Sequence, residues 1–151
     1  MKLILLLINF LFVFDCYSQI KIDDVGDNWK AKVATSLSLI KQVDPNKYEL
    51  INDVCKHITY WDGDFSTTED SVTIMISQKD MRFNSINNIA AILVHESKHL
   101  FYLKHNIKLP PNYEEILAYH YELEFLSKIP NVEPWLVNNA LKNIEYYGLV
   151  K

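Results

Sequence analysis

Apolar residues recur at helical spacing along the first part of the chain. One stripe consists of Trp29, Val33, Leu37 and Ile40. Because these positions share one face, they predict a helix that ends near Val43 and is capped by Asp27 or Asn28. Asp44-Pro45 predicts a second helix, since a capping residue precedes proline at the first helical position. The apolar stripe of this second helix is Tyr48, Ile51, Cys55 and Ile58.

The hydrophobic period changes between residues 57 and 77. His57 to Trp61 mixes β-branched and aromatic residues, and Ser71 to Ser77 alternates in character. Asp62-Gly63-Asp64 lies between these segments and is a turn signal. We therefore expect two antiparallel strands. The second strand has an edge from which an extended peptide can be bound.

A long helical pattern follows the strands. It covers Ile86 to Asn106, and Asn84 or Ser85 can cap its start. Pro110-Pro111 ends the segment that follows this helix, because proline removes a backbone donor and restricts the preceding residue. We expect the rest of the chain to be organised around this helix.

Two more helices are expected after the double proline. Asn112 can cap the first, from Tyr113 to Ile129, and Pro130 stops it. Glu133-Pro134 opens the last helix, which Gly148 closes. Its expected apolar side consists of Trp135, Leu136, Ala140, Leu141 and Ile144. The sequence thus predicts an α+β single domain that is mostly helical, with a short antiparallel sheet or hairpin near the central helix.

Candidate chemistry lies on the central helix, in the segment His-Glu-Ser-Lys-His at residues 95–99. The apolar side of the helix consists of Ile86, Ala90, Leu93, Val94, Leu100 and Phe101. His95, Glu96, His99 and Tyr102 fall on another side. The two histidines lie one above the other there, so both rings can bind one metal ion. Glu96 can then take a proton from metal-bound water instead of ligating.

A catalytic zinc ion needs a third protein ligand and an open position for water. The helix after the double proline carries several glutamates in the segment EEILAYHYELEF. We expect Glu115 to be the ligand, because the short connection 107–111 packs the two helices side by side and Ala118 permits a close approach. Glu114 and Glu122 are the alternatives to Glu115.

The other histidines fit a zinc site less well. His105 has the spacing of a third histidine ligand in one zinc motif, but that motif needs glycine where Tyr102 stands. On a continuing helix His105 therefore points away from the metal. His120 lies on a different face from Glu115, and His57 begins a strand, so both are expected to be packing or surface residues.

The segment Ile86 to Phe125 resembles the gluzincin metallopeptidases, and more closely their small, minimal relatives. His95, Glu96 and His99 match the two ligands and the general base of that family. Glu115-Ile-Leu-Ala118 looks like the Glu-x-x-Ala segment that supplies the glutamate ligand in several gluzincin groups. The resemblance implies a zincin-like domain with Zn²⁺ held by two histidines and a glutamate, which hydrolyses peptide bonds.

One position departs from the family pattern. Several gluzincin groups place aspartate four residues after the glutamate ligand to support a histidine, and here Tyr119 occupies that position. Tyr119 or Glu122 would therefore have to orient His95 or His99. A donor for the carbonyl oxygen of the substrate is also expected. The tyrosines with suitable chemistry are Tyr102, Tyr119, Tyr121, Tyr146 and Tyr147.

The amino-terminal segment predicts export. Lys2 supplies a positive start, Leu3 to Phe14 is apolar apart from one asparagine, and residues 16–18 suit signal peptidase. We expect a signal peptide over residues 1–18, cleaved between Ser18 and Gln19, and a single domain over residues 19–151. The apolar run is too short for an ordinary membrane span. The mature chain then keeps only Cys55, which cannot form an internal disulfide and is expected to be a buried hydrophobe.

The net charge of −4 narrows the expected partners. Nucleic acids and anionic membranes recruit basic surfaces, so neither is expected as a partner. The sequence therefore favours a secreted or periplasmic zinc metallopeptidase acting on peptides or proteins. The alternative is an exported binding or structural domain on the same scaffold, with a stabilising zinc ion or none. An inhibitor-like or immunity protein is a third possibility.

Overall fold

The structure is a computed structural model that describes residues 20–26, 28–81 and 83–150. The expected signal peptide, its cleavage site and the candidate cap Asp27 lie outside the described residues. The elements in chain order are β1 (Lys21–Ile22), α1 (Trp29–Val43), α2 (Pro45–Val54), β2 (His57–Trp61), β3 (Thr67–Thr68), β4 (Thr73–Ser77), α3 (Gln78–Met81), α4 (Ile86–Lys104), α5 (Pro111–Leu126) and α6 (Pro134–Leu149). The expected α+β, mostly helical single domain is confirmed.

The sheet has the strand order β1-β2-β4-β3. β1, β2 and β4 run parallel, and only β3 is antiparallel to its neighbour β4. The expected antiparallel pairing of β2 with β4 is therefore wrong. The chain does not fold straight back at Asp62-Gly63-Asp64, but runs on to β3 and returns to insert β4 between β2 and β3. Such a crossover makes β2 and β4 parallel to each other.

The position of β4 also removes one predicted site. Both of its edges are hydrogen-bonded to other strands, so the prediction that this strand binds an extended peptide is wrong. β4 begins at Thr73, two residues later than expected. The Asp70 carboxylate accepts hydrogen bonds from the backbone N–H groups of Val72 and Thr73, which holds the chain in a turn up to that point.

Two predicted helix starts have different outcomes. Asn28 has a positive φ of 60° and makes no side-chain capping hydrogen bond, so its predicted capping role in α1 is wrong. Asp44 does cap α2, where its Oδ1 accepts from the backbone N–H of Lys47 at 3.4 Å and Pro45 stands at the first helical position. α2 ends at Val54, so Cys55 and Ile58 of the expected stripe lie beyond it, and both are buried.

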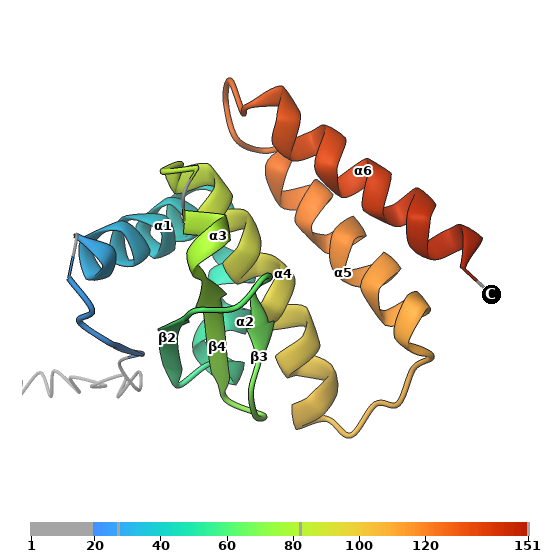
Figure 1. Ribbon diagram of the computed structural model, residues 1–151, viewed down its shortest axis with the longest axis horizontal. Helices are drawn as coiled ribbons and strands as arrows, with labels where there is room; N and C mark the ends of the chain where they lie inside the picture. Colours follow the sequence, from blue (N-terminus) through green and yellow to red (C-terminus); the bar gives the residue numbers. More distant parts are fainter. Residues whose placement is uncertain (1–19, 27, 82, 151) are drawn as a thin grey trace, which may run out of the picture.

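Helix α4 lies between the sheet and the α5–α6 hairpin (Figure 1). Its start is capped as predicted, by Ser85, whose side chain accepts from the backbone N–H of Asn88. The buried residues of α4 meet those of α1, α2 and the sheet in one core. The largest fully buried side chains of that core include Ile40, Ile51, Ile58, Ile74, Ile76, Leu93, Leu100 and Phe125.

The α5–α6 hairpin differs from the prediction at its ends. α5 starts at Pro111 after Pro110 and ends at Leu126, so Asn112 is not its cap. The Asn112 side chain instead donates to the backbone oxygen of Val150. Gly148 does not close α6, which continues to Leu149. Of the expected apolar side of α6, Leu136 and Ala140 are buried, while Trp135 and Leu141 are exposed.

Glu133, just before α6, ties the hairpin to the start of α4. Its carboxylate accepts one hydrogen bond of 2.6 Å from Ser85 Oγ and another of 2.6 Å from Asn87 Nδ2. The beginning of α6 therefore lies beside the beginning of α4. Among the described residues, none of the helices has the length and apolar character needed to cross a bilayer.

Candidate metal centre

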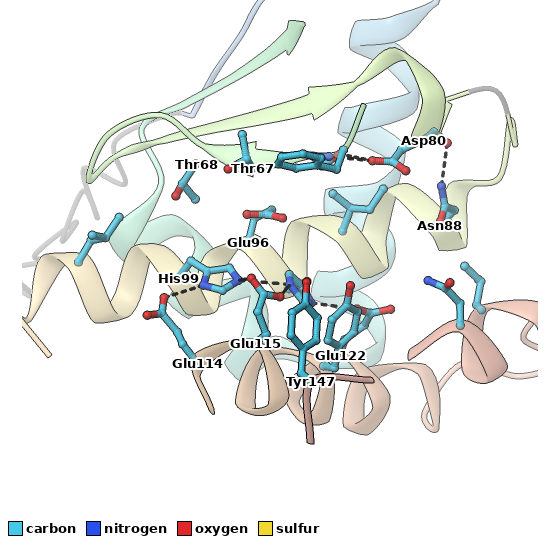
Figure 2. Close-up of a pocket in the computed structure, with 18 residues that line it drawn as sticks. Thr67, Thr68, Asp80, Asn88, Glu96, His99, Glu114, Glu115, Glu122 and Tyr147 are labelled. Carbon is cyan, nitrogen blue, oxygen red and sulfur yellow. Dashed lines mark hydrogen bonds and ion pairs between the residues drawn. The ribbon is translucent and has the colours of Figure 1, made fainter. Parts of the chain in front are cut away.

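His95 and His99 on α4 and Glu115 on α5 bring their side chains together. The two Nε2 atoms lie 3.2 Å apart. One oxygen of Glu115 lies 3.4 Å from Nε2 of His95, and the other lies 3.6 Å from Nε2 of His99. Figure 2 shows His99 and Glu115 on the α5 side of α4. These three residues could hold a metal ion, and they are called the metal-binding group below.

The spacing of the three donors fits a tetrahedral ion. Zinc binds imidazole nitrogen at about 2.0–2.1 Å, so two ligands of a tetrahedral site lie about 3.3 Å apart. The two Nε2 atoms are 3.2 Å apart, close to that value, and the separations of 3.4 and 3.6 Å are each to a different oxygen of Glu115. Two imidazoles and one carboxylate are also a donor set typical of catalytic zinc, which leaves a fourth position for water.

A second carboxylate lies behind each imidazole. Nδ1–H of His95 donates to Glu122 at 3.1 Å, and Nδ1–H of His99 donates to Glu114 at 2.7 Å. A proton held on Nδ1 by these bonds leaves Nε2 of each ring to coordinate an ion, which is the arrangement of carboxylate–histidine–metal sites. Glu114 and Glu122 thus lie on the far side of the rings from Glu115.

The sequence identified one of these two orienting residues. Glu122 was expected as a partner of His95 or His99, together with Tyr119 as the other candidate. Tyr119 instead packs edge-on against the ring of His95, with the ring centroids 4.3 Å apart. Glu114 was considered only as a ligand, and its contact with Nδ1 of His99 was missed. The sequence signal for this contact was the adjacent pair Glu114-Glu115, which places two carboxylates at the start of one helix.

The carboxylates shift the proton affinity of the cluster. Burial lowers the pKa of His95, but hydrogen bonds to Glu115 and Glu122 outweigh burial and raise that pKa to about 10. Burial raises the pKa of Glu115, but the hydrogen bond with His95 and the charge of His99 together hold it below its usual value. The carboxylates therefore favour a positive charge between them. Without a metal ion, that charge is a second proton on His95, at Nε2, and a bound ion would replace this proton.

Glu96 lies next to this group in the same cavity. Its side chain is buried, with 6% of the residue exposed, and burial raises its pKa above that of an ordinary glutamate. In Figure 2 it points to the sheet side of α4, where Thr67 and Thr68 lie. A buried carboxylate with a raised pKa is suited to accept a proton and to give it back.

The cavity has a volume of about 450 Å³ and is bounded by α4, α5, α6 and the segment 65–68 that contains β3. Of the five tyrosines considered as oxyanion donors, Tyr119 and Tyr147 line it. Asp80 and Asn88 also line the cavity, although no pattern in the sequence predicted it. No local motif marks these two residues, because only the packing of α3 and β3 against α4 brings them to the cavity.

The remaining candidates lie outside the metal-binding group. His105 and His120 are exposed, as expected of surface residues. His57 contacts the carboxylate of Asp23 at 2.9 Å. Cys55 is buried as expected, and burial raises the pKa of its thiol to about 11, which suppresses thiolate chemistry.

Comparison of the chain with models of protein families, with curated proteins and with solved structures finds no match. The geometry of the cluster is therefore the basis for assigning a function.

Proposed function

We propose that the protein is a zinc-dependent metallopeptidase of the gluzincin type, in which His95, His99 and Glu115 hold the metal ion. The observation that carries this proposal is the convergence of two Nε2 atoms and one carboxylate beside the buried Glu96. Glu122 and Glu114 support it, since they set the orientation of both rings. Export by the signal peptide expected at residues 1–18 belongs to the same proposal.

A peptide substrate is favoured by the wall of the cavity opposite α5. β3 is an edge strand of the sheet, and its residues Thr67 and Thr68 line the cavity. The free edge of such a strand can hydrogen-bond to the backbone of an extended peptide. That pairing would lay a peptide between β3 and the metal-binding group.

Each step of the hydrolysis has a residue suited to it. When bound, zinc supplies Lewis acidity, which makes water a nucleophile near neutral pH. Glu96 takes a proton from the water as its oxygen bonds to the carbonyl carbon of the peptide. Glu96 then gives that proton to the amine nitrogen as the C–N bond breaks.

Tyr119 and Tyr147 are the candidate donors to the carbonyl oxygen. Both line the cavity, and their rings stack with centroids 6.2 Å apart. Burial raises the pKa of both hydroxyls, so each stays protonated and can donate a hydrogen bond. Such donors stabilise the negative charge that develops in the transition state.

The test compares the wild type with Glu96→Gln for zinc content and for hydrolysis of a mixture of unstructured peptides. We expect equal zinc content and a loss of hydrolysis of about 100- to 10,000-fold, the contribution of a general base. Glu69→Gln is the matched control, because Glu69 is exposed and lies outside the cavity. Equal hydrolysis by the wild type and Glu96→Gln would rule out Glu96 as the base.

A further inference from the structure

One end of the cavity contains polar groups that the proposed hydrolysis does not use. Asp80 and Asn88 lie at this end, away from His99 and Glu114 (Figure 2). On α4, Asn88, Ile92 and Glu96 follow each other at four-residue intervals, so they share one face. Asn88 is about 12 Å along the helix from Glu96. This end is therefore within reach of a long side chain from a substrate bound beside Glu96.

The carboxylate of Asp80 is held in place through one of its oxygens. Oδ2 accepts from the backbone N–H of Ser66 at 3.0 Å, from Ser66 Oγ at 2.6 Å and from Ser77 Oγ at 3.1 Å. Within residues 20–26, 28–81 and 83–150, Oδ1 has no hydrogen-bond partner. Asp80 thus offers, at the wall of the cavity, one fixed acceptor that has no partner among the described residues.

Asn88 offers a second acceptor at the same place. Its Nδ2 donates to the backbone oxygen of Asp80 at 2.9 Å, a bond drawn in Figure 2. That bond fixes the amide, so Oδ1 must point away from the carbonyl of Asp80. The residue is only 7% exposed, and its Oδ1 has no partner in the described part of the chain. Solvent can still reach this oxygen, but a ligand that fills this end of the cavity would displace that water and would have to supply a donor in its place.

Apolar side chains flank the two acceptors. Ile92 of α4 and Leu136 of α6 both line the cavity. The tie from Glu133 to Ser85 and Asn87 places the start of α6, and with it Leu136, at this end. Among the described residues that line the cavity there is no lysine or arginine. The walls suit a hydrocarbon stem, and the acceptors suit a cationic tip.

We propose that this end of the cavity binds the arginine or lysine side chain of a peptide substrate. The proposal rests on the peptidase function proposed above and names its substrate class. The methylene groups of the side chain pack against Ile92 and Leu136. The cationic tip donates to Oδ1 of Asp80 and Oδ1 of Asn88, and a hydrogen bond from a charged donor to a carboxylate is among the stronger kinds.

The charge of the cavity disfavours the opposite kind of substrate. A glutamate side chain at this end would face the carboxylate of Asp80, with Glu96 and Glu122 lining the same cavity. An uncharged side chain such as norleucine would leave both unpaired acceptors buried without a donor. At this end of the cavity we therefore expect a basic substrate side chain to be preferred over an apolar one, and an apolar one over an acidic one.

The cleavage test uses peptides that differ at one position near the scissile bond, which holds arginine, norleucine or glutamate. We expect kcat/KM for the arginine peptide to exceed that for the norleucine peptide by about 10- to 100-fold, the value of a hydrogen bond between charged groups. Asp80→Asn should remove most of this preference, because its amide oxygen can still accept from Ser66 and Ser77 while the charge is lost. Glu69→Gln removes an equal charge outside the cavity and should keep the preference.

Substitutions of Asn139 provide a second test of the basic pocket, and they leave Asp80 and its hydrogen bonds unchanged. Its exposed side chain lines the cavity one turn after Leu136, and within the described residues this side chain makes no hydrogen bond. Asn139→Lys should therefore abolish the preference for arginine, and Asn139→Asp should strengthen it. If Asp80→Asn does not fold, these two variants decide the question.

A binding measurement separates this proposal from the peptidase function. Fluorescence anisotropy gives the affinity of the same arginine and norleucine peptides for zinc-loaded Glu96→Gln, with and without Asp80→Asn. Cleavage by the wild type without a preference for arginine overturns the basic pocket alone. Tighter binding of the arginine peptide that Asp80→Asn abolishes, without any cleavage, supports the pocket and contradicts the peptidase. If the peptides are neither bound nor cleaved, both the basic pocket and the peptidase function are overturned.

Discussion

Nδ1–H of His95 donates a hydrogen bond of 3.1 Å to Glu122, which lies 27 residues further along the chain. Glu115 lies 3.4 Å from Nε2 of the same ring. Because Glu115 and Glu122 are seven residues apart, they share one face of α5. A single helix therefore contacts both nitrogens of His95, so the packing of α5 on α4 sets the geometry of the metal-binding group.

Glu122→Ala should weaken metal binding without unfolding the protein. The variant leaves His95 free to rotate and without a partner for Nδ1–H, and loss of such an orienting carboxylate lowers metal affinity by about 10- to 100-fold. Competition with a chromophoric chelator measures the zinc affinity, and circular dichroism checks the fold. Glu145→Ala is the control, since Glu145 is an exposed residue of α6. A zinc affinity equal to that of the wild type would contradict the role given to Glu122.

Removal of the metal should abolish hydrolysis and leave the fold intact. The core residues Leu93, Val94 and Leu100 are fully buried on α4 without any help from the metal-binding group. We therefore expect a chelator to leave the circular dichroism spectrum unchanged and readdition of zinc to restore hydrolysis. A chelator that melts the domain, with no hydrolysis under any condition, would favour the alternative of a structural ion.

Asp23 should contribute to stability at neutral pH and lose that contribution in acid. Hydrogen bonds from His57 and then Thr59 hold the pKa of Asp23 at about 2, below its ordinary value of 3.8. A lowered pKa in the folded state stabilises the protein above pH 3.8, and the effect is lost as the pH falls toward 2.

Chemical unfolding of the wild type and Asp23→Asn from pH 7 to pH 2 measures this effect. Because the side chain is partly exposed, we expect the variant to be less stable at pH 7 by at most about 1 kcal/mol. The two unfolding curves should converge near pH 2. A difference in stability that persists there would show that Asp23 acts by other means than its charge.

Local signals predicted much of the helical structure. Asp44-Pro45 and Ser85 mark helix starts through contacts within a few residues, and both starts are confirmed. The length of α4 is also close to the prediction, because its apolar period runs through the whole segment. Asn28 failed as a cap because its backbone has a positive φ. Asparagine can adopt that conformation, but the residue type alone does not predict that it will.

Long-range packing explains what the sequence did not predict. The parallel pairing of β2 with β4 depends on β3 reaching the far side of β4, and a turn signal at Asp62-Gly63-Asp64 does not specify where the chain goes next. The motif and the helix after the double proline were enough to propose His95, His99 and Glu115. The role of Glu114 required the relative rotation of α4 and α5, which spacing in the sequence does not encode.

Zinc titration of the metal-free protein tests the proposed centre most directly. Isothermal titration calorimetry should give one zinc ion per chain for the wild type, and Glu115→Ala should lose more than about 100-fold in affinity, since it removes a ligand and not only an orienting partner. Glu69→Ala should bind zinc as the wild type does. Absence of stoichiometric zinc binding by the wild type, or equal affinity in Glu115→Ala, would contradict the proposed centre.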